Sequence, residues 1–134
     1  MKIIKAVIFF FLISHVATAH ADTVFNTGGD TVRVELVFGL RKPDHHIVRK
    51  KEWKSFVEEE ITPRFPNGFT LTEATGHWQE AAGVITEPSI IFTVVCVMNA
   101  DTESKINDIA ARYKSRFRQE AVLRIDTKIH YWLK

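Results

Sequence analysis

Polar and apolar residues alternate along the first regularly patterned stretch of the chain, from Thr31 to Leu40. A period of two predicts a β-strand with one buried face. The residues expected on the buried side are Val32, Val34, Leu36 and Phe38.

Between Lys50 and Phe65 the period lengthens to that of an amphipathic helix. Pro63 should end this helix, because a proline disfavours helical geometry in the residue before it. The positions expected to face the core are Trp53, Phe56, Val57 and Ile61.

Two further strands follow in the middle of the chain. Phe69 to Gln79 is rich in β-forming residues, and Gly76 within it predicts a bulge or a close backbone approach. A turn at 81–83 leads into a strand that resumes near Val84. The continuous apolar run Ile90–Met98 is typical of a central strand that is covered on both faces.

A second helix and a last strand complete the pattern. Asp101 or Thr102 is expected to cap the helix, and the last strand should begin near Ala121. The apolar stripe of the helix consists of Ile106, Ile109, Ala110, Tyr113 and Phe117. The apolar positions of the strand are Leu123, Ile125 and Ile129.

The predicted order is therefore β-α-β-β-α-β. Right-handed crossovers place both helices on the same side of the sheet. The sequence thus predicts an α+β protein with a single ferredoxin-like domain, in which two helices pack on one face of a four-stranded antiparallel sheet.

The first 21 residues have the three parts of an export signal: basic Lys2 and Lys5, the apolar run Ala6–Val16, and small residues at Ala19-His20-Ala21. Ala17-Thr18-Ala19 is a second candidate cleavage site. A retained anchor is the alternative, but the run is well short of the roughly 18 to 20 apolar residues that cross a bilayer. We expect cleavage after Ala21 and a periplasmic or secreted protein, with a flexible leader at 22–30 and one domain at 31–134.

The charge of the chain changes when the signal is removed. Eighteen basic residues face 16 acidic ones, and two of the basic ones, Lys2 and Lys5, belong to the signal. The mature domain is therefore neutral, so its charge gives no reason to expect nucleic acid or an anionic membrane as its partner.

The single cysteine, Cys96, lies inside an apolar run and cannot form an internal disulfide. No histidine or basic residue lies near it in sequence to activate the thiol. A small buried hydrophobe is the expected role of Cys96, and a reactive or dimer-bridging thiol is the alternative.

No catalytic signature is present in the mature sequence. Its four histidines lack metal-ligand spacing and have no cysteine partner, so no metal is expected. There is no Gly-x-Ser-x-Gly elbow and no glycine-rich phosphate loop after the first strand, so no cofactor is expected either. The histidines are His45, His46, His77 and His130.

The sheet face opposite the helices is one candidate surface. Alternation assigns Arg33 and Glu35 of the first strand to it, and Arg124 and Asp126 of the last strand could complete a ladder of cross-strand charge pairs. This face is a polar ligand surface, an ordinary solvated sheet face, or half of a homodimer interface.

Several stretches resemble a bacterial family known as domain of unknown function 3574, and they occur in order between about Val32 and Asp126. The resemblance implies a compact exported α+β domain and no particular reaction. The stretches are Glu35–Leu40, Trp53–Phe56, Thr62–Gly68, Gly76–Trp78, Glu87 and Tyr113–Leu123.

Two places depart from the usual pattern of that family. The first helix opens with Val48-Arg49-Lys50-Lys51 instead of a Ser or Thr cap followed by acidic residues, so its start is expected to fray. Gly76-His77-Trp78 replaces the family's Gly-Gln-Trp, which changes any polar site there.

The motif residues offer one further candidate site. Arg64, held between two bulky residues, is expected to pair with Glu87 or Glu120 at the end of the first helix. The alternative is an anion or carboxylate site at Arg64 with Trp78 and Gln119 nearby. The full set of hypothetical ligand-binding residues is Arg64, His77, Trp78, Glu87, Gln119 and Glu120.

Two classes of function follow. The first is a binding or interaction module for a small molecule or a protein. The second is a small metal-independent and nucleotide-independent enzyme that works in a pocket between the sheet and the helices, which rests on analogy with other proteins of this fold.

Overall fold

The computed structural model describes residues 30–81 and 83–132. The expected signal at 1–21, and the expected leader at 22–30 apart from Asp30, lie outside the described residues. The elements in chain order are β1 (Thr31–Gly39), α1 (Lys50–Phe56), the π-helical turn η1 (Val57–Ile61), β2 (Thr70–Glu80), β3 (Gly83–Val97), α2 (Ala100–Phe117) and β4 (Leu123–Lys128).

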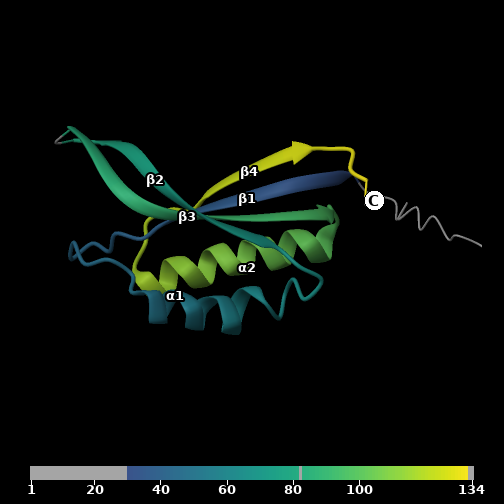
Figure 1. Ribbon diagram of the computed structural model, residues 1–134, viewed down its shortest axis with the longest axis horizontal. Helices are drawn as coiled ribbons and strands as arrows, with labels where there is room; N and C mark the ends of the chain where they lie inside the picture. Colours follow the sequence, from purple (N-terminus) through teal and green to yellow (C-terminus); the bar gives the residue numbers. More distant parts are fainter. Residues whose placement is uncertain (1–29, 82, 133–134) are drawn as a thin grey trace, which may run out of the picture.

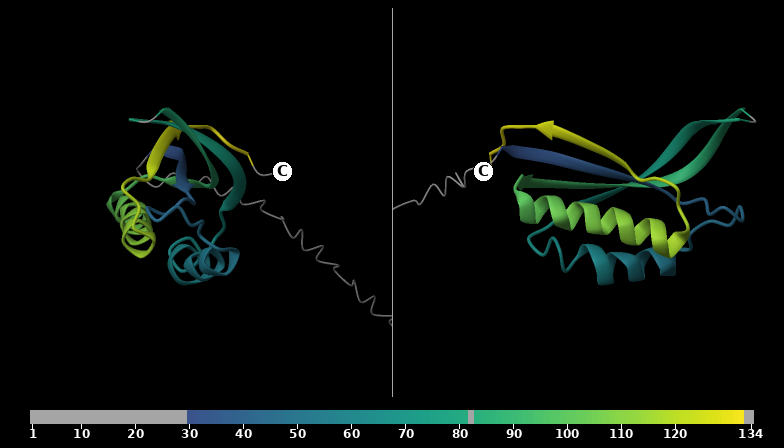
Figure 2. Two further views of the ribbon diagram at one scale, coloured as in Figure 1. Left: turned by 90° about the vertical axis from the view of Figure 1, so that its left-hand side faces the viewer. Right: turned by 180° about the vertical axis from the view of Figure 1, so that it is seen from behind.

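The strands form one antiparallel sheet in the order β2-β3-β1-β4 (Figure 1). Both helices lie on the same face of this sheet, as the end-on view makes clear (Figure 2). The α+β, ferredoxin-like arrangement predicted from the sequence is confirmed. None of the helices within the described residues is long and apolar enough to cross a membrane.

The core lies between the sheet and the helices. Phe38 of β1, Phe56 of α1 and Tyr113 of α2 are fully buried there and stack edge to face or tilted. The Tyr113 hydroxyl donates a hydrogen bond to the Gly39 carbonyl oxygen at 2.8 Å. Burial, and then the nearby Glu87 carboxylate, raise the pKa of Tyr113, so the phenol stays protonated and ties α2 to the end of β1.

The predicted first helix is shorter and less regular than its pattern indicated. It is α-helical only to Phe56 and continues as a π turn to Ile61, where the Thr62 amide donates to the Val57 carbonyl. Phe56 and Ile61 are both fully buried although they are five residues apart. A π turn closes through i→i+5 hydrogen bonds, so it brings these two residues to the same face.

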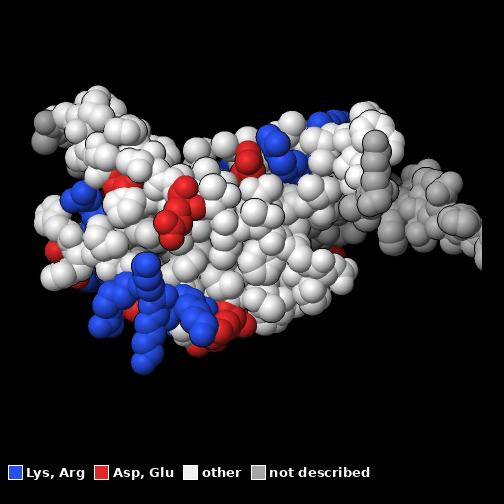
Figure 3. Space-filling view, viewed as in Figure 1, with Lys and Arg blue, Asp and Glu red and all other residues white. Residues whose placement is uncertain are grey.

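The caps of the helices also differ from the prediction. The N-cap of α2 is Asn99, not Asp101 or Thr102, because the Asn99 side chain accepts a hydrogen bond from the Thr102 amide at 2.8 Å. At α1, Glu52 accepts from the Arg49 amide at 2.8 Å. This contact places an acidic residue in the first turn and offsets the cations that were expected to fray it. Basic side chains gather over α1 beside acidic ones (Figure 3).

The strand β3 is covered on one face only, which corrects the expectation of a strand covered on both. Phe92 and Val94 face the helices and are buried, whereas Val95 points to the open face and is 46% exposed. Both crossovers place their helices on the same side of the sheet. No element of the described chain therefore covers the other side (Figure 2).

The strands β2 and β3 extend beyond the end of β1 as a two-stranded hairpin. The register of β1 with β3 ends at the pair Gly39–Ser89, whereas β2 and β3 stay paired to Glu80–Gly83. We call residues 75–80 and 83–88 the hairpin arm. The arm rises on the open side of the sheet (Figures 1 and 2).

Candidate functional site

A pocket of about 840 Å³ lies at the end of the open sheet face. Its walls come from the end of β1 and the loop after it (37–45), from the hairpin arm (78–87), and from the segment between α2 and β4 (118–123). The pocket is therefore not between the sheet and the helices, where the sequence analysis placed it. The arm extends past β1 and leaves this hollow beside the two connecting segments.

Two glycines let side chains lie flat against the sheet at the base of this pocket. A Cβ on Gly39 would lie 2.6 Å from Glu87 Oε1. A Cβ on Gly76 would lie 2.6 Å from Trp78 Nε1 and 3.0 Å from Ser89 Oγ. Gly76 thus provides the close approach that the sequence predicted, and the unbroken β2–β3 register excludes a bulge there.

Glu87 is the less exposed of the two carboxylates that line the pocket. Its Oε2 accepts a hydrogen bond from the Arg41 amide at 3.2 Å. No salt bridge joins Glu87 to a cation within the part of the chain that the structure describes. Its negative charge is close enough to Tyr113 to contribute to the raised pKa of that phenol. Glu87 is therefore a partly enclosed acid without a counter-ion among the described residues.

Three buried polar atoms around Glu87 have no hydrogen-bond partner among the described residues: Trp78 Nε1, Ser89 Oγ and Arg41 Nε. Ser89 is only 2% exposed. A buried donor without a partner costs about 1–3 kcal/mol, and folded proteins usually avoid this cost. All three atoms can donate a hydrogen bond. Trp78 and Arg41 line the pocket, so an acceptor group of a ligand there would satisfy their donors.

The cations at the rim of the pocket have partners. Lys42 Nζ lies 3.0 Å from Glu52 Oε1, and an Arg118 guanidinium nitrogen lies 2.6 Å from Asp44 Oδ2. Glu120 is exposed and makes no hydrogen bond or ion pair with the described residues. The charges left for a ligand are those of two carboxylates, on Glu87 and Glu120, and of the Arg41 guanidinium.

The rim also contains the non-glycine residues with positive φ in the described chain, His45 at 64° and Arg118 at 54°. Such conformations cost on the order of 1 kcal/mol and persist where surrounding contacts hold them. The Arg118–Asp44 ion pair and the hydrogen bond from Gln119 Nε2 to the Arg41 carbonyl, at 2.8 Å, join the two rim segments.

The structure brings together some of the residues proposed from the sequence. Trp78, Glu87, Gln119 and Glu120 line this one pocket. His77 does not, because alternation along β2 turns it to the opposite face, where its Nδ1 lies 3.1 Å from Thr86 Oγ1.

Arg64 also lies elsewhere, and its expected pairing with Glu87 or Glu120 is wrong. Its guanidinium lies 2.9 Å from Glu60 Oε2 and 3.6 Å from Asp108 Oδ2. Glu60 lies in η1, four residues before Arg64 in the turn that follows, so a local carboxylate in the helix layer is the partner of Arg64. The ion pair joins the end of η1 to α2.

The predicted charge ladder on the open sheet face is wrong as well. Arg33 and Glu35 do face the open side, but Arg124 pairs across the sheet with the core residue Leu36 and so faces the helices. Its guanidinium binds Glu103 of α2 through two contacts of 2.7 Å. Asp126 shares that face. The residues of β4 that share the open face with Arg33 and Glu35 are Leu123, Ile125 and Thr127.

Sequence reasoning missed Gly39 and Arg41, which line the pocket, and Ser89, which is buried beside Gly39 on the same sheet face. Gly39 and Ser89 are cross-strand partners 50 positions apart, and nothing local joins them. Ser89 is a polar residue directly before a long apolar strand segment, and that was the one available signal.

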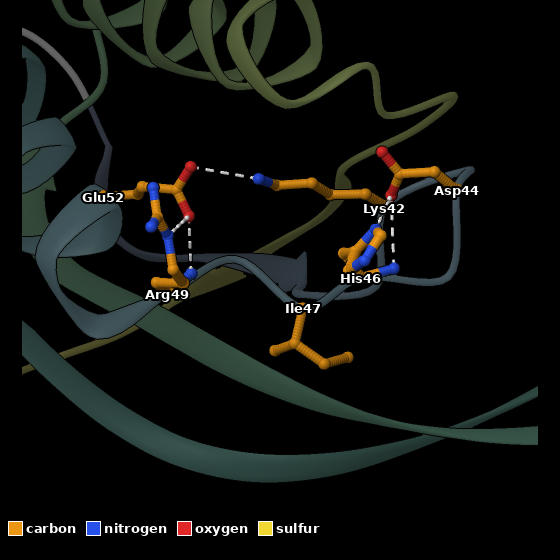
Figure 4. A pocket seen from close by; sticks show the side chains of 6 residues that line it. All are labelled: Lys42, Asp44, His46, Ile47, Arg49 and Glu52. Atoms are coloured by element: carbon orange, nitrogen blue, oxygen red, sulfur yellow. Dashed lines mark hydrogen bonds and ion pairs between the residues drawn. The ribbon is translucent and has the colours of Figure 1, made fainter.

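A second hollow, of about 320 Å³, lies beside the start of α1 (Figure 4). Its charged groups already have partners: Glu52 accepts from Lys42 and Arg49, and Asp44 accepts from the His46 amide. The hydrogen bonds from Arg49 and Lys42 lower the pKa of Glu52 to about 2. This hollow is a helix cap with internally paired charges. Among the described residues, no group of three His, Cys, Asp or Glu side chains is placed to hold a metal ion.

Together the fold and the pocket define a small ferredoxin-like α+β domain with one open sheet face and a polar hollow at its end. The chain belongs to the family of proteins of unknown function DUF3574, which matches residues 33–131. No curated protein matches the sequence.

Two solved structures resemble this chain in fold. A phage SAM lyase in complex with S-methyl-5'-thioadenosine is similar with a TM-score of 0.60 and 17% identity, over 75% of this chain and 83% of that chain. A phage SAM lyase in its apo state gives a TM-score of 0.51 and 13% identity, over 80% and 96% of the two chains. At these identities the likeness shows the fold alone.

Proposed function

We propose that this protein is a binding module, and that the pocket beside the hairpin arm binds a small organic molecule that carries a positive charge. The observation that carries the proposal is the carboxylate of Glu87, which is partly enclosed and has no counter-ion among the described residues. A ligand cation would provide one, and burial of both charges in the pocket would strengthen their attraction.

The surroundings of Glu87 support the same class of ligand. Trp78 lines the pocket, and an indole ring attracts a cation by about 0.5–2 kcal/mol. The unpartnered donors on Trp78 and Arg41, which both line the pocket, favour a hydrogen-bond acceptor on the same molecule. We therefore expect an amphoteric ligand, with a cationic centre near Glu87 and an oxygen or nitrogen acceptor a few bonds away.

Calorimetric titration with two matched compounds tests this proposal. S-adenosylmethionine carries a sulfonium cation, and S-adenosylhomocysteine lacks that charge but is otherwise closely similar. We expect the cationic compound to bind at least tenfold more tightly. The Glu87→Gln variant should lose this preference, whereas Glu73→Gln, which removes an exposed carboxylate of β2 outside the pocket, should keep it. Equal affinities for the two compounds in the wild-type protein would contradict a cation site.

Native mass spectrometry extends the test beyond chosen probes. The protein is purified from the expressing cells without refolding, and its mass is compared with that of Glu87→Gln. A reproducible additional mass that the variant lacks would identify a ligand retained at this carboxylate. An additional mass present in both proteins would place the ligand away from Glu87 and contradict the proposal.

A second candidate function is a small metal-independent and nucleotide-independent enzyme. It is favoured by the likeness in fold to a phage SAM lyase and by the presence of Glu87 as a carboxylate base in the pocket. The test is incubation with S-adenosylmethionine and chromatography for S-methyl-5'-thioadenosine. Product formation by the wild-type protein, and its loss in Glu87→Gln, would favour the enzyme over the binding module.

We further propose that the domain functions outside the cytoplasm after cleavage behind Ala21. The basic, apolar and small-residue parts of residues 1–21 support this proposal. Expression of the full chain in a bacterial host, followed by N-terminal sequencing of the periplasmic protein, is the direct test. A mature protein that begins at Asp22 is expected, and recovery of the intact chain from the cytoplasm would contradict it.

A further inference from the structure

The amphipathic pattern of β4 is reversed relative to the core of this domain. Its apolar residues Leu123 and Ile125 point to the open sheet face, where they are 45% and 42% exposed. Its charged residues Arg124 and Asp126 point to the side that the helices cover. A strand normally turns its apolar residues toward the more deeply buried side.

Other apolar side chains join those of β4 on the same face. The cross-strand register places Leu123 beside Val37, and Val37 beside Ile91. Val95 of β3, 46% exposed, lies beside Arg33. We define the open-face patch as the apolar residues Val37, Ile91, Val95, Leu123 and Ile125. Arg33, Glu35 and Thr93 separate Val95 from the other four residues, so the patch is apolar around a polar centre. Exposed apolar side chains gathered on an uncovered sheet face in this way mark an interaction surface.

We propose that the open-face patch binds the same patch of a second copy of this chain, so that two sheets pack face to face in a twofold dimer. The charges within the patch indicate that the partner is a second copy of the chain. Arg33 and Glu35 are the charged residues of β1 on this face, so the centre of the patch carries one positive and one negative charge. In a twofold interface, Arg33 of one copy meets the partner's Glu35, and Glu35 meets the partner's Arg33.

The ion pair that these two residues make within one chain is weak. The separation of Arg33 Nη2 and Glu35 Oε2 is 3.8 Å, and the Arg33 side chain is 47% exposed. An exposed pair of this kind contributes about 0–1 kcal/mol. Little is therefore lost when each side chain turns to a partner across the interface, where apolar surroundings exclude water.

The area of the open sheet face is small for a specific interface, so a partner must cover all of it. The nine residues of β1 span roughly 30 Å, and four strands span about 19 Å. The flat footprint is thus on the order of 570 Å², before the relief of side chains is counted. A specific interface removes about 800 Å² of accessible surface from each partner. A stable partner must cover the whole face, as the sheet of a second copy does when two sheets pack face to face.

The dimer also bears on the pocket beside the hairpin arm. Val37 and Leu123 belong both to the open-face patch and to the lining of that pocket. A second copy on the patch therefore borders the pocket and encloses it further. The dimer does not depend on the proposed ligand, because the reversed pattern of β4 and the two central charges are independent of Glu87.

Sedimentation equilibrium of the purified protein tests the inference. The wild-type protein is expected to be a dimer at micromolar concentrations, and Val95→Asp and Ile125→Asp are expected to be folded monomers. Neither residue lines the pocket, so a loss of association is distinct from a damaged ligand site. The matched control is Val84→Asp: Val84 is 67% exposed on β3, but it points to the opposite face. This variant should remain a dimer.

Charge-reversal variants distinguish a specific twofold interface from non-specific association through an apolar surface. Arg33→Glu gives two negative charges at the centre of the patch, and Glu35→Arg gives two positive ones. Each variant alone should be a monomer, and an equimolar mixture should form a heterodimer with at least tenfold tighter association than either variant alone. A monomeric wild-type protein at millimolar concentration, an equal effect of Val84→Asp, or no recovery in the mixture would each overturn the inference.

Discussion

The carboxylate of Glu87 occupies the space in which a side chain on Gly39 would begin, because its Oε1 lies 2.6 Å from the position of a Cβ on that glycine. The two residues come from neighbouring strands, and Glu87 belongs to the part of β3 that extends beyond β1. The missing side chain at Gly39 therefore lets the acid lie along the sheet and face the pocket.

Gly39→Ala should displace Glu87. A carboxylate at the end of a flexible side chain can move, so we expect a loss of about 1 kcal/mol in the free energy of unfolding. Urea denaturation of Gly39→Ala, Glu87→Ala and the double variant measures the coupling between them. The cost of Gly39→Ala should largely vanish when Glu87 is already alanine. An equal cost in both backgrounds would show that the glycine is needed for another reason.

Tyr113→Phe should destabilise the domain although it retains the ring. The substitution removes the 2.8 Å hydrogen bond to the Gly39 carbonyl and leaves that acceptor without this donor. A loss of about 1–2 kcal/mol in the free energy of unfolding is expected. Tyr131→Phe is the matched control, because Tyr131 is 46% exposed. Equal stability of the two variants would contradict a structural role for the Tyr113 hydroxyl.

Ser89→Ala should be neutral or stabilising, by up to about 1 kcal/mol, because it removes a buried hydroxyl that has no partner among the described residues. Thermal unfolding compares it with Ser55→Ala, whose hydroxyl donates to Glu59 at 2.6 Å and accepts from Arg116 at 2.9 Å. Ser55→Ala should lose a few tenths of a kcal/mol. A lower unfolding temperature for Ser89→Ala than for the wild-type protein would show that the hydroxyl makes a stabilising contact.

The Glu103–Arg124 pair should make stability depend on pH below neutrality. Hydrogen bonds from Arg124 and then Asn107 lower the pKa of Glu103 from 4.5 to about 2. A carboxyl with a lower pKa in the folded state binds fewer protons there than in the unfolded chain. Its stabilising effect is therefore present above about pH 4.5 and is lost as the pH falls toward 2.

The measurement is urea denaturation of wild type and Glu103→Gln between pH 2 and pH 7. The variant should be less stable near pH 7 and should lose less stability on acidification. Glu73→Gln, which removes an exposed carboxylate outside this pair, should follow the wild-type curve. Parallel curves for wild type and Glu103→Gln would mean that the pair contributes nothing.

Local patterns in the sequence determined the elements and their order. Alternation identified β1, helical spacing identified the helices, and Gly76 indicated the close approach that Trp78 makes. These signals are readable because they depend on neighbours two to four positions away. The order of elements, with the handedness of crossovers, was enough to predict the ferredoxin-like sheet.

Spacing alone was a poorer guide where the backbone departs from a regular helix. Phe56 and Ile61 share a buried face because a π turn lies between them, and a helical pattern of 3.6 residues per turn does not describe that. Arg64 likewise pairs with Glu60, about one helical turn away, whereas the expected partners were Glu87 and Glu120.

Tertiary structure alone decided on which face of the sheet the apolar and the charged residues of β4 lie, and which residues form the pocket. A strand in which apolar and polar residues alternate can pair with its neighbour in two registers that differ by one residue. A shift from one register to the other moves every side chain of the strand to the opposite face of the sheet. The choice depends on what α2 offers, and Glu103 on that helix holds Arg124 on the helix side. In the same way Gly39, Glu87 and Gln119 meet through strand pairing and loop closure. Such long-range contacts leave no periodic trace in the sequence, because a sequence pattern records which side a residue faces relative to its neighbours and not what it meets there.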